Sequence, residues 1–232
     1  MKKLLSILFL CAVISVPVLA QEDEVEVEVF SQAPQQQERG RNMFITLGFA
    51  GSYMGEAFVG GGMSYGYYPA EHNLFTFEVN AGYYDAGKIG WFKYLYYGYD
   101  YYGDIKYSYV SLQCLLTWNY VAKISEKASW RFGPSIGVLS ITGSESYDPS
   151  DVKGLPTSTS ETKTAFTAGI GTGITINFLK RWFVDFGYRY LANSGITFDA
   201  KTIRILGTDI PVDKQEFDKS EHQFNITAGW RF

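Results

Sequence analysis

The last twelve residues of the chain alternate strictly between two kinds of side chain. One set suits a lipid-facing or interfacial wall, and the other set is polar or glycine. The first set is His222, Phe224, Ile226, Ala228, Trp230 and Phe232, and the second is Glu221, Gln223, Asn225, Thr227, Gly229 and Arg231. Because successive side chains of a strand point to opposite faces, this pattern predicts a β-strand with one apolar wall.

Seven earlier segments share the period of two, with bulky apolar residues on one face and small, polar or charged residues on the other. They lie near 45–53, 58–68, 75–83, 108–120, 129–141, 165–178 and 182–190. With the terminal segment they make eight strands, an even number that returns the chain to the side where it began. We therefore predict an all-β fold over residues 43–232, an eight-stranded antiparallel up-and-down transmembrane β-barrel.

The links between the predicted strands alternate in length. The links near 69–73, 122–127 and 179–181 are short, and those near 84–106, 142–163 and 192–219 are long. Only the link at 54–57 departs from this alternation by being short. Since short turns of outer-membrane barrels face the periplasm and long loops face outside, the pattern predicts periplasmic ends for the barrel and long extracellular loops.

The amino-terminal segment predicts export. Lys2 and Lys3 precede an apolar run over 4–16, and Pro17 and small residues follow up to Ala20. We predict a signal peptide over 1–20, because the run is shorter than the roughly 20 residues of a membrane-spanning helix. Residues 21–42 are acidic and Val-rich, then polar, which predicts a largely disordered periplasmic tail. The alternative for 25–30 is a strand added to the edge of a partner.

Removal of the signal peptide changes the charge balance of the chain. Without Lys2 and Lys3, 18 basic residues stand against 24 acidic ones, a net charge of −6. This mildly acidic balance argues against nucleic acid as a partner.

The region 43–232 resembles the small eight-stranded outer-membrane barrels typified by OmpA and OmpX. The closing strand carries the resemblance, because its Phe224, Ile226, Trp230 and Phe232 are similar to the signal that the barrel-assembly machinery reads. The resemblance implies a location in the bacterial outer membrane, with membrane lipid and lipopolysaccharide around the barrel. It also implies a packed polar interior.

Four charged residues fall on the inward face of the predicted strands: Glu78, Arg131, Asp185 and Arg189. An eight-stranded barrel is only wide enough to be filled by its own side chains. The four residues therefore predict an ion-pair network that seals the lumen. The alternative function for them is a small-solute pore or a proton path.

Catalysis has weak support in the sequence. A lipid A deacylase or acyltransferase needs a His beside a Ser at the outer leaflet, and only Ser220 and His222 fit that description. His72 lies in a predicted periplasmic turn, and the outward Cys114 adds no metal-ligand set. We predict no enzyme activity, no catalytic residues, no metal and no cofactor. A soluble barrel of lipocalin type is a further alternative, and it would place its apolar residues inside.

The link at 84–106 is rich in aromatic residues. Tyr offers rigid, amphipathic contact area at low entropic cost, which favours recognition of a host or cell-surface glycan or protein. The alternative is that the flanking strands extend beyond the membrane as a ribbon whose aromatic side chains pair across strands. The candidate recognition residues are Trp91, Phe92, Tyr94, Tyr96, Tyr97, Tyr99, Tyr101 and Tyr102. We predict a structural or surface-recognition role, such as adhesion, mediated by the outer loops.

Overall fold

The computed structural model describes residues 42–96, 99–150, 152, 155, 158–206 and 208–232. The predicted signal peptide over 1–20 and the predicted tail up to residue 41 lie outside these ranges. Within the described ranges, no helix has the length and hydropathy needed to cross a membrane.

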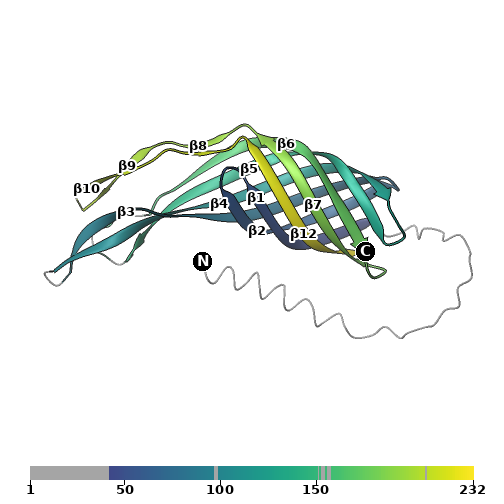
Figure 1. Cartoon of the computed structure of the whole chain (residues 1–232), viewed down its shortest axis with the longest axis horizontal. Helices are drawn as coiled ribbons and strands as arrows, with labels where there is room; N and C mark the ends of the chain where they lie inside the picture. Colours follow the sequence, from purple (N-terminus) through teal and green to yellow (C-terminus); the bar gives the residue numbers. More distant parts are fainter. Residues whose placement is uncertain (1–41, 97–98, 151, 153–154, 156–157, 207) are drawn as a thin grey trace, which may run out of the picture. The chain divides into compact units, whose positions relative to one another are not determined.

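Eight long strands form a closed antiparallel barrel (Figure 1). The order around the barrel is β1-β12-β7-β6-β5-β4-β3-β2, so each strand pairs with its neighbour in the series and β1 closes on β12. The eight-stranded up-and-down topology predicted from the sequence is confirmed. The strands are β1 Met43–Tyr53, β2 Ala57–Ala70, β3 Asn73–Tyr96, β4 Tyr99–Lys123, β5 Ala128–Asp148, β6 Ser160–Asn177, β7 Trp182–Asn193 and β12 Ser220–Arg231.

The two ends of the barrel differ. Short turns at 71–72, 124–127 and 178–181 lie at one end, together with the start of β1 and the end of β12. We call this the turn end. The opposite end, which we call the extension end, has the tight turn 54–56, where Gly55 adopts a φ of 81° that an L side chain rarely takes.

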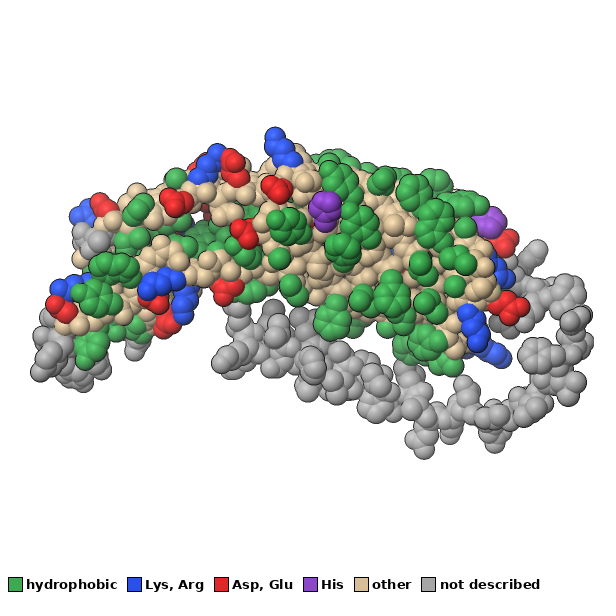
Figure 2. Space-filling model, in the orientation of Figure 1, with side chains coloured by type: hydrophobic (Ala, Val, Ile, Leu, Met, Phe, Trp, Pro, Cys, Tyr) green, Lys and Arg blue, Asp and Glu red, His purple; other side chains and the backbone are tan. Residues whose placement is uncertain are grey.

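The wall of the barrel has an apolar outer face. Phe49 is 75% exposed, Val59 71% and Leu116 58%, whereas inward Thr117 and Gln113 are almost fully buried. In Figure 2 the hydrophobic side chains cover the wall of the barrel. This arrangement is the reverse of a lipocalin-type barrel, so that alternative is wrong.

The prediction of three long loops is wrong for most of their residues. β3 and β4 continue as a paired ladder as far as Tyr96 and Tyr99, and β5 runs to Asp148. Between β7 and β12 lie two small two-stranded sheets, which pair β8 with β11 and β9 with β10. These strands are β8 Ile196–Phe198, β9 Lys201–Ile205, β10 Thr208–Val212 and β11 Gln215–Phe217. We call these outer parts of β3, β4 and β5, with β8 to β11, the extension (Figure 1).

The extension has its own hydrophobic core. Phe92 of β3 and Ile105 of β4 pack with Ile203, Ile205 and Ile210 of the β9–β10 hairpin, and all five side chains are at most 8% exposed. Burial of several large apolar side chains of this kind stabilises the extension, at about 1.5–3 kcal/mol for each one fully buried. The extension is therefore a packed structure.

Candidate functional site

The lumen is filled by apolar side chains at the turn end. Phe44 and Phe183 meet edge to face with ring centroids 5.2 Å apart. Each ring lies over a glycine of the neighbouring strand, Phe44 over Gly66 and Phe183 over Gly229, where a Cβ would collide with the ring. The inward glycines therefore make room for the aromatic plug. The buried members of this cluster are Phe44, Leu74, Val121 and Phe183.

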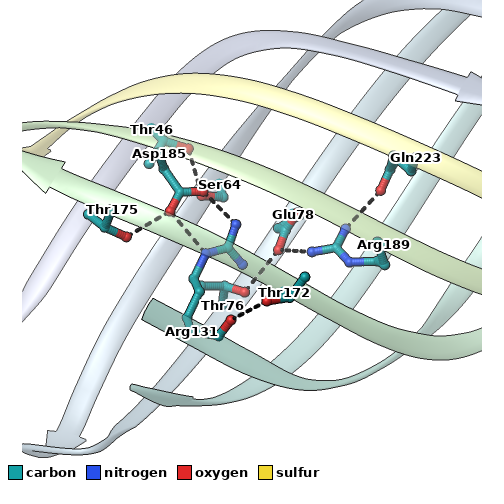
Figure 3. Close-up of polar contacts among 10 residues, drawn as sticks. All are labelled: Thr46, Ser64, Thr76, Glu78, Arg131, Thr172, Thr175, Asp185, Arg189 and Gln223. Atoms are coloured by element: carbon teal, nitrogen blue, oxygen red, sulfur yellow. Dashed lines mark hydrogen bonds and ion pairs between the residues drawn. The ribbon is translucent and has the colours of Figure 1, made fainter. Parts of the chain in front are cut away.

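Beyond this plug, an ion pair joins β5 to β7 over the inward face of β6 (Figure 3). Nε of Arg131 donates to Oδ1 of Asp185 at 2.9 Å, and Nη2 donates to the second carboxylate oxygen. The hydroxyl of Thr175 also donates to Oδ1, at 2.7 Å. Arg131 is 8% exposed and Asp185 7%, so this bidentate pair is shielded from solvent.

A second ion pair joins β7 to β3 across the lumen. Nη2 of Arg189 donates to Oε1 of Glu78 at 2.7 Å, and Thr76 donates to the same oxygen at 3.0 Å. The four charged residues predicted from the sequence are thus brought together as two ion pairs of opposite charges.

The second pair continues into a chain of amide side chains that the sequence prediction missed. Arg189 donates to Gln223 at 2.8 Å, Gln223 donates to Gln113 at 2.9 Å, and Gln113 donates to Glu221 at 2.8 Å. Glu221 is only 1% exposed. The inward position of Glu221 follows from the period of two in β12. That signal could have added Glu221 to the four inward charged residues predicted from the sequence.

A larger apolar plug fills the lumen at the extension end. Phe58 of β2 is 2% exposed, and its ring centroid lies 5.6 Å from that of Phe217 in β11 and 5.7 Å from that of Tyr84 in β3. The small β8–β11 sheet therefore covers this mouth of the barrel. The other buried members of the cluster are Met54, Tyr107, Tyr109, Leu139, Ile141, Ala165, Ile196 and Phe198.

Little space remains between the two plugs. One cavity of about 30 Å³ lies beside Glu78, Arg131 and Asp185, and a second of about 20 Å³ lies beside Gln113 and Glu221. Each has room for one or two water molecules. The interior is thus a packed polar layer between two apolar plugs, an arrangement suited to stability rather than to passage of solutes.

The two histidines lie on the outside of the barrel. Nδ1 of His222 is 2.8 Å from the hydroxyl of Tyr188, and its ring meets Tyr190 edge to face. His72 stacks on Tyr120 in the turn end. In the part of the chain that the structure describes, no three His, Cys, Asp or Glu residues are grouped to hold a metal.

The predicted recognition residues are divided between the two faces of the β3–β4 ribbon. Phe92 is 1% exposed in the core of the extension, so its assignment to recognition is wrong. Trp91 and Tyr102 are 57% and 63% exposed, and their rings meet edge to face with centroids 5.2 Å apart. Tyr94 stacks on Tyr101 at 5.8 Å. These cross-strand contacts bear out the alternative of an aromatic ribbon; Tyr96 ends β3, Tyr99 begins β4, and Tyr97 lies outside the described residues.

Ion pairs flank the exposed aromatic pair. Lys88 lies 2.6 Å from Asp104 on one side of the rings, and Lys93 lies 2.6 Å from Asp100 on the other. We call this surface the outer ribbon face. It consists of Lys88, Trp91, Lys93, Asp100, Tyr102 and Asp104. The outer ribbon face presents two aromatic rings between two ion pairs, whose charges cancel. The opposite face of the ribbon packs in the hydrophobic core of the extension.

Glu145 of β5 links β5 to β9 within the extension. Its Oε1 accepts hydrogen bonds from the hydroxyls of Tyr147 and Thr159, and its Oε2 lies 3.2 Å from Nζ of Lys201 in β9. Burial alone would raise the pKa of this carboxyl, but the hydrogen bonds from Thr159 and Lys201 outweigh it and the pKa is lowered. The ionised carboxylate therefore holds the β9–β10 hairpin to β5.

We expect the β9–β10 hairpin to loosen in acid. A lowered folded-state pKa means that Glu145 contributes its full stabilisation above its ordinary value of 4.5, and that this is lost as the pH falls through the folded value. Glu145→Gln should lower the local opening free energy by about 1–2 kcal/mol at neutral pH, because Lys201 is partly exposed. Hydrogen exchange of β9 amides measures the effect. Glu161→Gln, which removes an exposed pair with Lys163, is the control; equal exchange in both variants would contradict this role of Glu145.

The fold and the filled lumen together define a class: a small closed antiparallel β-barrel with an apolar outer wall and a packed polar interior.

No family model and no curated protein matches the chain. Solved structures of similar fold include Ail, the attachment invasion locus protein of Yersinia pestis, at 16% identity over 82% of this chain and 97% of that one, with a TM-score of 0.43. Neisserial surface protein A matches at 12% identity over 82% of this chain and 94% of that one, with a TM-score of 0.43. A major outer membrane protein of Thermus thermophilus matches at 12% identity over 82% and 99%, with a TM-score of 0.49. At these identities the likeness concerns the fold and says nothing of a shared ligand.

Proposed function

We propose that the chain is an integral outer-membrane β-barrel protein with a sealed lumen, and that its extension recognises a ligand outside the cell. The apolar outer wall supports the membrane location, since such a surface is disfavoured in water. The turn end then faces the periplasm and the extension faces outside, as in barrels with short periplasmic turns. Membrane lipid and lipopolysaccharide surround the wall in this orientation.

The exposed Trp91–Tyr102 pair is the observation that carries the recognition role. Large aromatic side chains held in place by a packed ribbon lose little entropy on binding, and Trp and Tyr are enriched among residues that dominate binding energy. The balanced charges around the rings favour a neutral or zwitterionic ligand. A glycan or a protein of a host or neighbouring cell fits this description.

Other parts of the barrel support the same assignment. Phe224, Ile226 and Phe232 are 60%, 54% and 43% exposed on the outer wall, available to the barrel-assembly machinery during insertion. The plugs and ion pairs disfavour the pore, and the contacts of His222 with Tyr188 and Tyr190 disfavour a lipid A-modifying enzyme. We propose no catalytic role.

We expect Trp91→Ala/Tyr102→Ala to weaken binding about tenfold or more, because aromatic residues at the centre of a contact often contribute about 2 kcal/mol each. Labelled proteoliposomes carrying the protein are applied to a glycan array and to cell surfaces, and the bound fraction is measured. Trp118→Ala/Tyr120→Ala is the control, since it removes a Trp and a Tyr from the wall near the turn end. Equal binding by wild type and the ribbon variant, with both folded, would contradict the proposal.

A further inference from the structure

The turn end carries basic side chains that form no ion pair with any described residue. Among the described residues, no ion pair is formed by Lys123, Lys127, Lys180, Arg181 or Arg231, a group that we call the cationic arc. The lysines of the outer ribbon face, by contrast, are each paired with an aspartate. The difference indicates that the cationic arc is free to bind an external anion.

The arc follows one continuous side of the barrel. They are Arg231 of β12, Lys180 and Arg181 of the β6–β7 turn, Lys127 of the β4–β5 turn and Lys123 at the end of β4. These parts succeed one another around the barrel. Main-chain hydrogen bonds join these parts, from Arg231 to the carbonyl of Arg181 at 2.9 Å and from Asn177 to that of Lys127 at 2.7 Å. The side chains of Lys123, Lys127, Lys180 and Arg181 are exposed. Glu126 is the only carboxylate side chain in these two turns.

The same turns expose large apolar residues. Ile124 is 61% exposed in the β4–β5 turn, and Phe178 and Leu179 are 53% and 61% exposed in the β6–β7 turn. A turn in bulk water would gain nothing from such residues, whereas a turn at the surface of a bilayer buries them among the acyl chains. Trp118 and Trp130 lie on the wall just above these turns and are 42% and 40% exposed, in the position of an aromatic girdle.

The exposed apolar residues and the aromatic girdle determine how deep in the bilayer the basic side chains lie. Trp side chains settle at the level of the lipid headgroups, and Lys and Arg next to buried apolar residues extend their charged ends to the same level. The cationic arc then lies in the plane of the lipid phosphates. The β2–β3 turn differs, because Glu71 and His72 replace the apolar residues and cations there.

We infer that the cationic arc binds the headgroups of anionic phospholipids in the periplasmic leaflet. The inference rests on the membrane placement under Proposed function and is independent of the recognition role. Each basic residue near an anionic bilayer contributes an attraction equivalent to about a fivefold preference for an anionic over a neutral lipid. The measured preference is smaller, because it is an average over all the lipids that contact the barrel. The two arginines contribute less than the lysines, since the guanidinium of Arg231 lies 4.9 Å from the ring of Phe183 and that of Arg181 lies 5.9 Å from the ring of Trp230.

The experiment measures which lipids surround the full chain in bilayers that mix phosphatidylcholine with phosphatidylglycerol. Spin-labelled analogues of both lipids report the motionally restricted fraction. We expect wild type to retain phosphatidylglycerol about twofold over phosphatidylcholine at low salt, and to lose this preference in high salt. Lys123→Gln/Lys127→Gln/Lys180→Gln/Arg181→Gln should bring the ratio close to one.

Two matched variants separate the cationic arc from general effects of charge. Lys88→Gln/Lys93→Gln/Lys106→Gln removes cations of the extension and should leave the ratio unchanged, and Lys123→Arg/Lys127→Arg/Lys180→Arg should keep the preference of wild type. A ratio near one for wild type at low salt, or a preference that survives in the quadruple variant, would overturn the inference. Wild type also tests it without any substitution that affects folding.

The outcomes also separate this inference from the proposed function. A preference for the anionic lipid, together with unchanged binding by the Trp91→Ala/Tyr102→Ala variant, would contradict the recognition role alone. Failure of wild type to insert into bilayers would contradict the membrane placement and the lipid binding together.

Discussion

Replacing Arg131 with methionine is expected to lower the free energy of unfolding of the barrel by about 3–5 kcal/mol, the usual result of removing one member of a buried ion pair. The carboxylate of Asp185 would lose both hydrogen bonds from the guanidinium and keep only that of Thr175. Equilibrium unfolding in denaturant from lipid vesicles, followed by Trp fluorescence, measures the change.

The double variant Arg131→Met/Asp185→Leu is expected to recover most of this loss, because apolar side chains of similar volume often replace a buried pair at little cost. Lys93→Met is the control, since its pair with Asp100 is exposed and should contribute little to stability. An equally small effect of Arg131→Met would contradict the buried pair. Steady conductance of wild type in planar bilayers would contradict the sealed lumen.

Phe58→Ala is expected to have an effect of similar size, about 3–5 kcal/mol, because it opens a cavity in the plug at the extension end. Phe58 is 2% exposed and contacts both Tyr84 and Phe217. The variant should also loosen the β8–β11 sheet, since Phe217 packs on the lost ring. The same unfolding measurement and limited proteolysis within 199–214 report the two effects.

Phe49→Ala provides the matched control for Phe58→Ala. Phe49 is 75% exposed on the outer wall, where in the proposed placement lipid fills the space left by a removed ring. We expect a clearly smaller loss of stability there than at Phe58. Equal losses at the two positions would show that Phe58 lies in a surface like that of Phe49 and would contradict the plug.

The strand count and the two faces of the wall follow from the sequence because they depend on a local rule. Side chains alternate between faces with a period of two, and in the proposed membrane placement lipid on one side demands apolar residues at every second position. The inward position of Arg131 and Asp185 follows from the same rule. Their pairing does not, because β5 and β7 are separated by β6 around the barrel and the register decides which side chains meet across the lumen.

The contacts that bury the inner face of the β3–β4 ribbon escaped prediction for a related reason. In the proposed placement the extension lies beyond the lipid, so no lipid enforces the alternation there. Lys, Asp and Tyr share one face of the ribbon, and Phe92 and Ile105 share the other. What buries Phe92 is the β9–β10 hairpin, which lies more than a hundred residues further along the chain. A contact of that separation leaves no periodic signal near Phe92.

By itself, the sequence determined the eight strands, their outward wall and the inward position of the four charged residues, because each depends on neighbours one or two residues away. Only the tertiary structure decided which charges pair, which rings form the plugs and which aromatic residues remain exposed on the ribbon. Those outcomes depend on strand register and on contacts between distant segments, and both are set when the barrel closes and the hairpins of the extension pack against it.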